Sequence, residues 1–167
     1  NGCREYYGNN ANNVRLVLSD NFEQGTYAPW ISIGGSVVDL SNESLNNNGH
    51  SLRGETGDVF GRDMMNVPIQ NNKEYKLSWW MKSESLLAEF YMNIRGHDTD
   101  GHVFSEPFAD SGVDSAFQNI EPGRWHYYTA SAYIDTLDVL DPDLIDEFEI
   151  QILTVTPLAN QGLYIDN

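Results

Sequence analysis

Cysteine is almost absent from the sequence, since Cys3 is the only one among 167 residues. A single cysteine excludes an intrachain disulfide and a Cys-x-x-Cys metal site. The four histidines are scattered and lack the spacing of a zinc-protease motif. The sequence also has no Gly-x-Ser-x-Gly element and no phosphate-binding P-loop. The familiar hydrolase, nucleotide-binding and zinc-enzyme classes therefore find no support in it.

Basic residues are scarce as well. Nine Lys and Arg face 25 Asp and Glu, which gives a net charge of −16 and a pI near 4.3. Contacts to nucleic-acid phosphates, or to an anionic membrane, require many more cations. No apolar run approaches membrane-spanning length, and no signal peptide is visible. An acidic surface suits a soluble extracellular protein and supplies oxygen ligands for calcium. We expect the chain to be a module of a longer secreted or cell-surface protein.

Aromatic residues are plentiful, by contrast. The chain has four Trp and nine Tyr, and aromatics make up 12% of it. A chain of this length can bury one core without disulfides, and that core does not need so many aromatic rings. Trp and Tyr combine a flat apolar face with a polar edge, which suits a binding surface. The composition therefore indicates one globular domain with aromatic residues left over for a ligand.

Short apolar segments separated by turn residues run through most of the chain. Residues 1–13 are Asn-rich and aperiodic, and we interpret them as a linker or lead-in to a single domain over 14–167. The strand-like segments are residues 14–18, 36–40, 50–53, 64–69, 74–82, 88–95, 125–134, 147–155 and 162–165. About nine short strands with this punctuation predict an all-β fold, a sandwich of two antiparallel sheets.

Alternation within three of these segments assigns each residue to a face. In 74–82, 88–95 and 147–152 one face is apolar, and we expect the opposite faces to share one solvated sheet. That sheet would carry aromatic and planar polar side chains: Trp80, Tyr91, Asn93, Arg95, Glu149 and Gln151. Aromatic rings cover the C–H face of a sugar ring, while amides, carboxylates and guanidinium groups replace the water lost by its hydroxyls. The pattern therefore favours carbohydrate binding.

Six short motifs, in order along the chain, resemble carbohydrate-binding module families 4, 9 and 22. They are the Asn-Phe-Glu-x-Gly opening at 21–25 followed by Trp30, the Gly-x-Ser-Leu element at 49–53, Phe60-Gly61 where the families often have Trp-x-Gly, the Tyr-x-Leu-Ser strand at 75–82, Gly-x-Trp at 123–125, and the closing Tyr-Ile-Asp-Asn at 164–167. The resemblance spans residues 14 to 167 and implies a jelly roll.

The resemblance also implies a structural calcium ion and a glycan site. Glu23 and Asp166 would be the side-chain ligands of the calcium, joined by backbone carbonyls around Asn21 and Gly49. Glycan would bind on a concave sheet face that holds the six residues named above, with Tyr127 and Arg53 as further candidates. Trp30 and Trp125 stand at motif positions of structural character and are left out of the site.

Three functions stay open at this point. We expect a non-catalytic module that binds a polysaccharide or oligosaccharide, is monomeric within a multidomain chain, and targets an attached glycoside hydrolase or polysaccharide lyase. A small jelly-roll enzyme would need a positioned carboxylate pair or a Tyr, His and Arg set. A structural or adhesive sandwich would cover Trp80 with a loop. The acidic charge disfavours strongly anionic glycans.

Overall fold

The computed structural model describes residues 19–20, 22–33, 39–45, 49–55, 59–84, 89–108, 118–119, 122–155 and 162–166. These residues form strands and one short 3-10 turn, η1 (Leu137–Val139). The strands are β1 (Trp30–Ile33), β2 (Asp39–Ser41), β3 (Ser51–Glu55), β4 (Val59–Asp63), β5 (Lys73–Ser83), β6 (Glu89–Asp98), β7 (Val103–Pro107), β8 (Gln118–Asn119), β9 (His126–Ile134), β10 (Ile145–Val155) and β11 (Gly162–Asp166). Within the described segments, no helix has the length and apolar character needed to cross a membrane.

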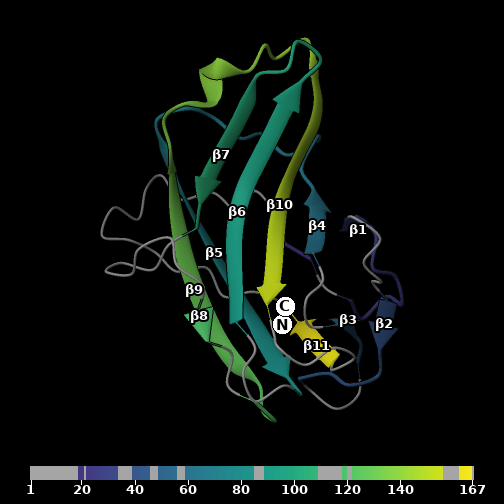
Figure 1. The fold of residues 1–167 in the computed structure, drawn as a ribbon. Helices are drawn as coiled ribbons and strands as arrows, with labels where there is room; N and C mark the ends of the chain where they lie inside the picture. Colours follow the sequence, from purple (N-terminus) through teal and green to yellow (C-terminus); the bar gives the residue numbers. More distant parts are fainter. Residues whose placement is uncertain are drawn as a thin grey trace.

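Two antiparallel sheets make up the fold. One has the strand order β1-β4-β10-β6-β7, with β8 paired to β6, and the other has the order β2-β3-β11-β5-β9. Figure 1 shows β6, β7 and β10 side by side at the front, with β5 passing behind β6. We call the first the β6–β10 sheet and the second the β5–β9 sheet. The predicted all-β sandwich is confirmed.

The core lies between the sheets and is built by alternating residues of the long central strands. Trp79 and Met81 enter it from β5, and Phe90, Met92 and Ile94 enter from β6. Phe148, Ile150 and Ile152 complete it from β10. Each such side chain contributes about 1.5–3 kcal/mol through burial. The apolar faces predicted for these three strands are the ones that the fold buries.

The strand predictions over 50–53, 74–82, 88–95, 125–134, 147–155 and 162–165 agree with β3, β5, β6, β9, β10 and β11. The strand predicted for 64–69 is wrong. Met65 N bonds to Asp63 Oδ1 and Val67 N bonds to Met64 O, at 2.8 and 2.9 Å, so local turn bonds replace a sheet ladder. The predicted strand at 14–18 and the lead-in at 1–13 lie outside the described residues. Strands β1, β4, β7 and β8 were not predicted. Of the strand predicted at 36–40, residues 39–40 are described and belong to β2.

Candidate functional site

The predicted site residues lie on two different sheets. Tyr91, Asn93 and Arg95 belong to β6, and Glu149 and Gln151 belong to β10, its direct neighbour. The other three candidates lie in the β5–β9 sheet: Trp80 on β5, Tyr127 on β9 and Arg53 on β3. The expectation that Trp80 shares one solvated sheet with the β6 and β10 residues is therefore wrong. Alternation determines which face a residue occupies, but pairing between distant segments determines which sheet it joins.

On the outer face of the β6–β10 sheet, polar side chains stand in register across two strands. Asn93 lies opposite Gln151, and Arg95 lies opposite Glu149. Asn93, Glu149 and Gln151 are only 8%, 3% and 5% exposed, although they point away from the core. Gln151 Nε2 donates to Glu149 Oε1 at 2.5 Å, and Asn93 Nδ2 donates to Ser105 Oγ on β7 at 3.1 Å. Neighbouring side chains thus hold these polar groups in fixed orientations.

Two polar atoms of this face have unmet bonding capacity. Asn93 Oδ1 and Arg95 Nε are buried and have no hydrogen-bond partner in the part of the chain that the structure describes. A buried polar atom left without a partner costs about 1–3 kcal/mol. One is an acceptor and the other is a donor, which is the pair of functions that hydroxyl groups of a ligand can satisfy.

A row of charged groups continues along the same two strands. His97 Nε2 lies 3.0 Å from Glu147 Oε2, and Arg95 Nη2 lies 3.9 Å from Glu147 Oε1. The hydrogen bond to Glu147 raises the pKa of His97, and Asp146 adds to the effect from the other side of the ring. Burial raises the pKa of Glu149, and the negative charge of Glu147 raises it further. The face therefore offers carboxylate acceptors beside the guanidinium group of Arg95 and the imidazole of His97.

Gly61 on β4 keeps space open beside the carboxylate. It lies opposite Gln151, and a Cβ at this position would come 2.9 Å from Glu149 Oε2 and 2.7 Å from Ile33 Cδ1. Real Cβ atoms essentially never approach so closely, so the position favours glycine. Neither Gly61 nor Ser105 was predicted as a site residue. The sequence signal was the Phe60-Gly61 motif, but it did not reveal which carboxylate the glycine adjoins.

The outer face of the β5–β9 sheet carries the remaining candidates. Trp80 lies directly opposite Tyr127, with ring centroids 5.2 Å apart and ring planes at 52°. Tyr127 is 41% exposed, and Trp80 is half-buried. Arg53 lies opposite Tyr164 of β11, two residues from Asp166. This is a second group of aromatic and polar side chains, separated from the first by the core.

Three of the four predicted metal ligands, Glu23, Gly49 and Asp166, lie within the described residues. A Cβ on Gly49 would lie 1.9 Å from Glu23 Oε1, so only glycine leaves room for that carboxylate. Gly49 N donates to Ser44 Oγ, and Leu45 N donates to Asp166 Oδ2 at 2.9 Å. Asn21 lies outside the described residues. The described segments contain no group of three or more His, Cys, Asp or Glu side chains that could hold a metal ion. A calcium ion here would thus depend on two carboxylates and backbone carbonyls.

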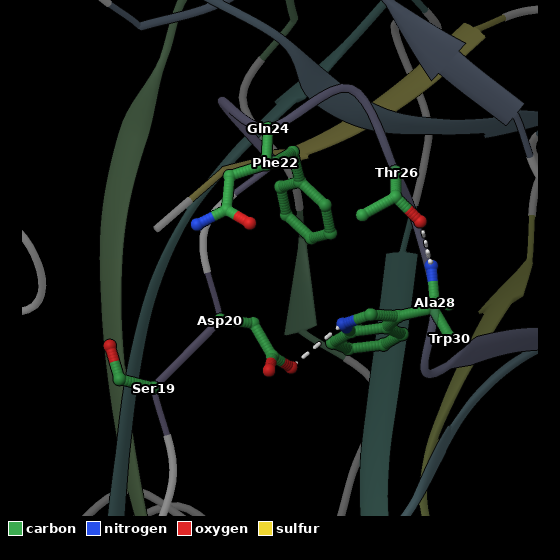
Figure 2. A pocket seen from close by; sticks show the side chains of 7 residues that line it. All are labelled: Ser19, Asp20, Phe22, Gln24, Thr26, Ala28 and Trp30. Atoms are coloured by element: carbon green, nitrogen blue, oxygen red, sulfur yellow. Dashed lines mark hydrogen bonds between the residues drawn. The ribbon is translucent and has the colours of Figure 1, made fainter.

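A separate pocket of about 220 Å³ opens beside β1. Its lining residues, labelled in Figure 2, are Ser19, Asp20, Phe22, Gln24, Thr26, Ala28 and Trp30. Asp20 Oδ2 accepts hydrogen bonds from Trp30 Nε1 and Arg62 Nε, and Oδ1 accepts from Arg62 Nη2, each at 2.9 Å. Three protein donors already engage this carboxylate. Asp20 therefore ties Trp30 and β4 together, which agrees with the structural role predicted for Trp30.

An antiparallel β-sandwich with two outer faces that combine rings, amides and charged groups defines a jelly-roll carbohydrate-binding module. The family model described as a carbohydrate binding domain matches residues 14–138, and the chain belongs to that family. It is a non-catalytic binding module, and the predicted family resemblance is confirmed.

Several proteins with similar sequence or structure are xylanases or xylan-binding domains. Endo-1,4-beta-xylanase C of Paenibacillus barcinonensis is 24% identical over 166 residues, which cover 93% of this chain and 15% of the xylanase. The CBM22-1 xylan-binding domain of Paenibacillus barcinonensis Xyn10C has a TM-score of 0.65 at 17% identity, covering 92% of this chain and 91% of that domain. The CBM22-1–GH10 modules of Clostridium thermocellum xylanase 10B, complexed with xylohexaose, have a TM-score of 0.62 at 17% identity. The match covers 90% of this chain and 27% of that one.

Proposed function

We propose that this module binds xylan through the outer face of the β6–β10 sheet and thereby holds an attached xylan-degrading enzyme on its substrate. The observation that carries the site is the buried polar row Asn93, Gln151 and Glu149, with Asn93 Oδ1 unsatisfied in the described part of the chain. A ligand that bonds to these groups would satisfy the buried amide and would account for their fixed arrangement on an outer sheet face.

The chemistry of the face suits an uncharged sugar chain. Gln151, Asn93 and Arg95 provide planar donors and acceptors, and Tyr91, half-buried on the same face, provides a ring. Arg95 is balanced by Glu147, so the face has no excess of positive charge for a strongly anionic polymer. The structural relatives include a xylan-binding domain and a complex with xylohexaose, which favours xylan among uncharged polysaccharides.

Isothermal titration with xylohexaose, together with adsorption to insoluble xylan, tests this proposal. Gln151→Ala and Asn93→Ala should each weaken binding by about tenfold or more, because each removes hydrogen bonds to hydroxyls that have left water. Asn66→Ala is a matched control, since Asn66 is an exposed amide in the loop after β4. Equal binding by all three variants, with unchanged thermal unfolding, would overturn the site.

We also propose that Glu23 and Asp166 bind a structural calcium ion together with backbone carbonyls near Gly49. Support comes from the approach of the Glu23 carboxylate to Gly49 and from the Leu45–Asp166 hydrogen bond, since Leu45 and Gly49 both lie shortly before β3. Oxygen ligands contributed by distant segments are typical of calcium. The ion would fasten β11 to the turn before β3.

The appended enzyme and the location of the module outside the cell belong to the same proposal. The chain spans 15% of the xylanase that it matches, so it corresponds to one segment of such a protein. Deleting this segment from its parent protein should slow hydrolysis of insoluble xylan and leave soluble xylo-oligosaccharide turnover unchanged. The parent protein should be recovered from the culture medium; its retention in the cytoplasm would contradict the proposal.

A further inference from the structure

The Trp80–Tyr127 pair marks the outer face of the β5–β9 sheet. The two residues are direct cross-strand neighbours, and their rings are tilted at a centroid distance of 5.2 Å. On the other side of β5, Trp80 lies opposite Asp166 of β11. Two large rings packed against each other on an outer sheet face form a contiguous apolar surface, unlike a lone exposed ring, and such a surface suits a stacking ligand.

A second row of rings lies two residues further along β5, about 7 Å away. Here Lys82 stands beside Tyr164 of β11, with Nζ 6.0 Å from the ring centroid. The ring of Trp125, just before β9, lies 6.4 Å from that of Tyr164 at 65°. The ring of Tyr164 is only 6% exposed and supports the row from below, so the rings that a ligand can reach are Trp80, Tyr127 and Trp125. We call these three residues, with the polar groups around them, the β5–β9 platform.

The cations of the platform are already paired with carboxylates. Lys82 Nζ lies 2.6 Å from Glu43 Oε1. Glu84 accepts a hydrogen bond from Tyr164 at 2.8 Å and interacts electrostatically with Arg53. An anionic ligand would have to compete with these carboxylates, whereas an uncharged ligand can use rings and polar groups as they stand.

We infer that the β5–β9 platform is a second glycan-binding surface and that its ligand is an uncharged polysaccharide chain. Trp80 and Tyr127 supply the stacking faces. Lys82, Glu43 and Arg53 supply donors and acceptors to ring hydroxyls at its margin. This inference rests on the proposed function for the class of ligand, but it concerns a different sheet and different residues.

Two binding faces on opposite sides of one sandwich give the module a distinct property. A long or insoluble polymer can engage both faces at once, so two modest affinities combine through the high local concentration of polymer. A short oligosaccharide occupies one face at a time. The module should therefore adsorb to insoluble xylan more strongly than its affinity for xylohexaose alone would predict.

Xylohexaose titrations and adsorption to insoluble, uncharged xylan test the second surface in the intact module. Trp80→Ala and Tyr127→Ala should each remove one of two xylohexaose sites and weaken adsorption by about tenfold. Trp80→Phe, which keeps a flat ring, should restore part of the binding and serves if the alanine variant fails to fold. Tyr133→Ala is the matched control, because Tyr133 is 55% exposed on the same face of β9, about 20 Å from Tyr127.

The outcomes separate the two sites. One xylohexaose site in the wild type, lost in Gln151→Ala and kept in Trp80→Phe and Tyr127→Ala, overturns the second surface and leaves the proposed function standing. Normal binding by Gln151→Ala with loss in Tyr127→Ala overturns the proposed site and supports the platform. Concentration-dependent dimerisation that Tyr127→Ala abolishes, without any effect of that variant on glycan binding, identifies a second copy as the occupant and overturns the inference. Absence of any wild-type binding overturns both.

Discussion

Glu149 on β10 accepts a 2.5 Å hydrogen bond from Gln151, two residues along the same strand, and both side chains are almost completely buried on an outer sheet face. Residues two apart on a strand point to the same side, so the bond orders a pair of functional groups on one surface. The hydrogen bond from the Gln151 amide does not by itself use the full acceptor capacity of the Glu149 carboxylate. In the proposed xylan site, the remaining lone pairs would accept hydrogen bonds from sugar hydroxyl groups.

The Glu149→Gln substitution should weaken binding and stabilise the fold at neutral and higher pH. Burial and the charge of Glu147 raise the pKa of Glu149, so the ionised form destabilises the folded state once the pH exceeds the pKa in the unfolded chain. We expect about tenfold weaker xylohexaose binding together with a higher Tm at pH 8. Calorimetric titration and thermal unfolding measure the two effects. A lower Tm at pH 8 would contradict the argument.

Substituting Gly61 by Ala should impair binding with little loss of stability. The new Cβ would meet Ile33 Cδ1 and Glu149 Oε2, which are the ends of side chains and can move. Displacement of Glu149 should lower affinity several-fold. Gly54→Ala is the contrasting variant, because its Cβ would come 1.9 Å from Cε1 of the buried Phe60. Gly54→Ala should chiefly destabilise the fold. Thermal unfolding and titration measure the two effects, and a large loss of stability in Gly61→Ala with normal stability in Gly54→Ala would contradict this account.

Asp98 should make folding stability sensitive to strongly acidic pH. Its carboxylate accepts hydrogen bonds from the backbone of Asp141 and from the ring and backbone of His102, and these lower the pKa of Asp98 from 3.8 to about 2. A carboxylate with a lowered folded-state pKa stabilises the fold above its unfolded pKa. That contribution is lost as the pH falls from about 3.8 to about 2.

Urea unfolding at a series of pH values measures this contribution of Asp98. The Asp98→Asn variant should be less stable than the wild type at neutral pH and should have a flatter dependence between pH 4 and pH 2. Asp143→Asn is the control, since Asp143 is exposed in the loop before β10. Parallel pH curves for the wild type and Asp98→Asn would contradict the prediction.

Calcium should raise the Tm of the module, and chelation should lower it. Binding to the folded state alone stabilises by about 2.7 kcal/mol when calcium is at one hundred times its Kd. Glu23→Gln and Asp166→Asn should abolish this response, whereas Asp143→Asn should keep it. Thermal unfolding with calcium and with a chelator gives the answer, and an unchanged Tm in the wild type would refute the proposed ion.

Alternation was sufficient to predict the faces of the long strands. Residues 74–82, 88–95 and 147–152 bury the predicted apolar faces because a period of two is fixed by strand geometry. Pairing partners were not accessible in the same way. Strands β5 and β6 follow each other in sequence, yet they belong to opposite sheets, and β6 pairs with β10 instead. That choice depends on long-range packing, which explains why Trp80 was assigned to the wrong sheet.

The local sequence pattern also could not predict the residues that support the proposed site. Ser105 is significant only because register places it opposite Arg95 and its hydroxyl reaches Asn93. Gly61 is significant because β4 pairs with β10 beside Glu149. In both cases the residue type is common, and the information lies in which strands become neighbours. The side chains that we propose as ligand contacts on this face could be nominated from sequence, but Ser105 and Gly61 beside them could not.

Backbone amide chemical shifts measured during titration with xylohexaose test the central claim most directly, because they report which strands contact the sugar. The account predicts the largest shifts at residues 91–95 of β6 and 149–151 of β10, and their loss in Gln151→Ala. Saturating ligand that leaves both strands unperturbed in the wild type would contradict it.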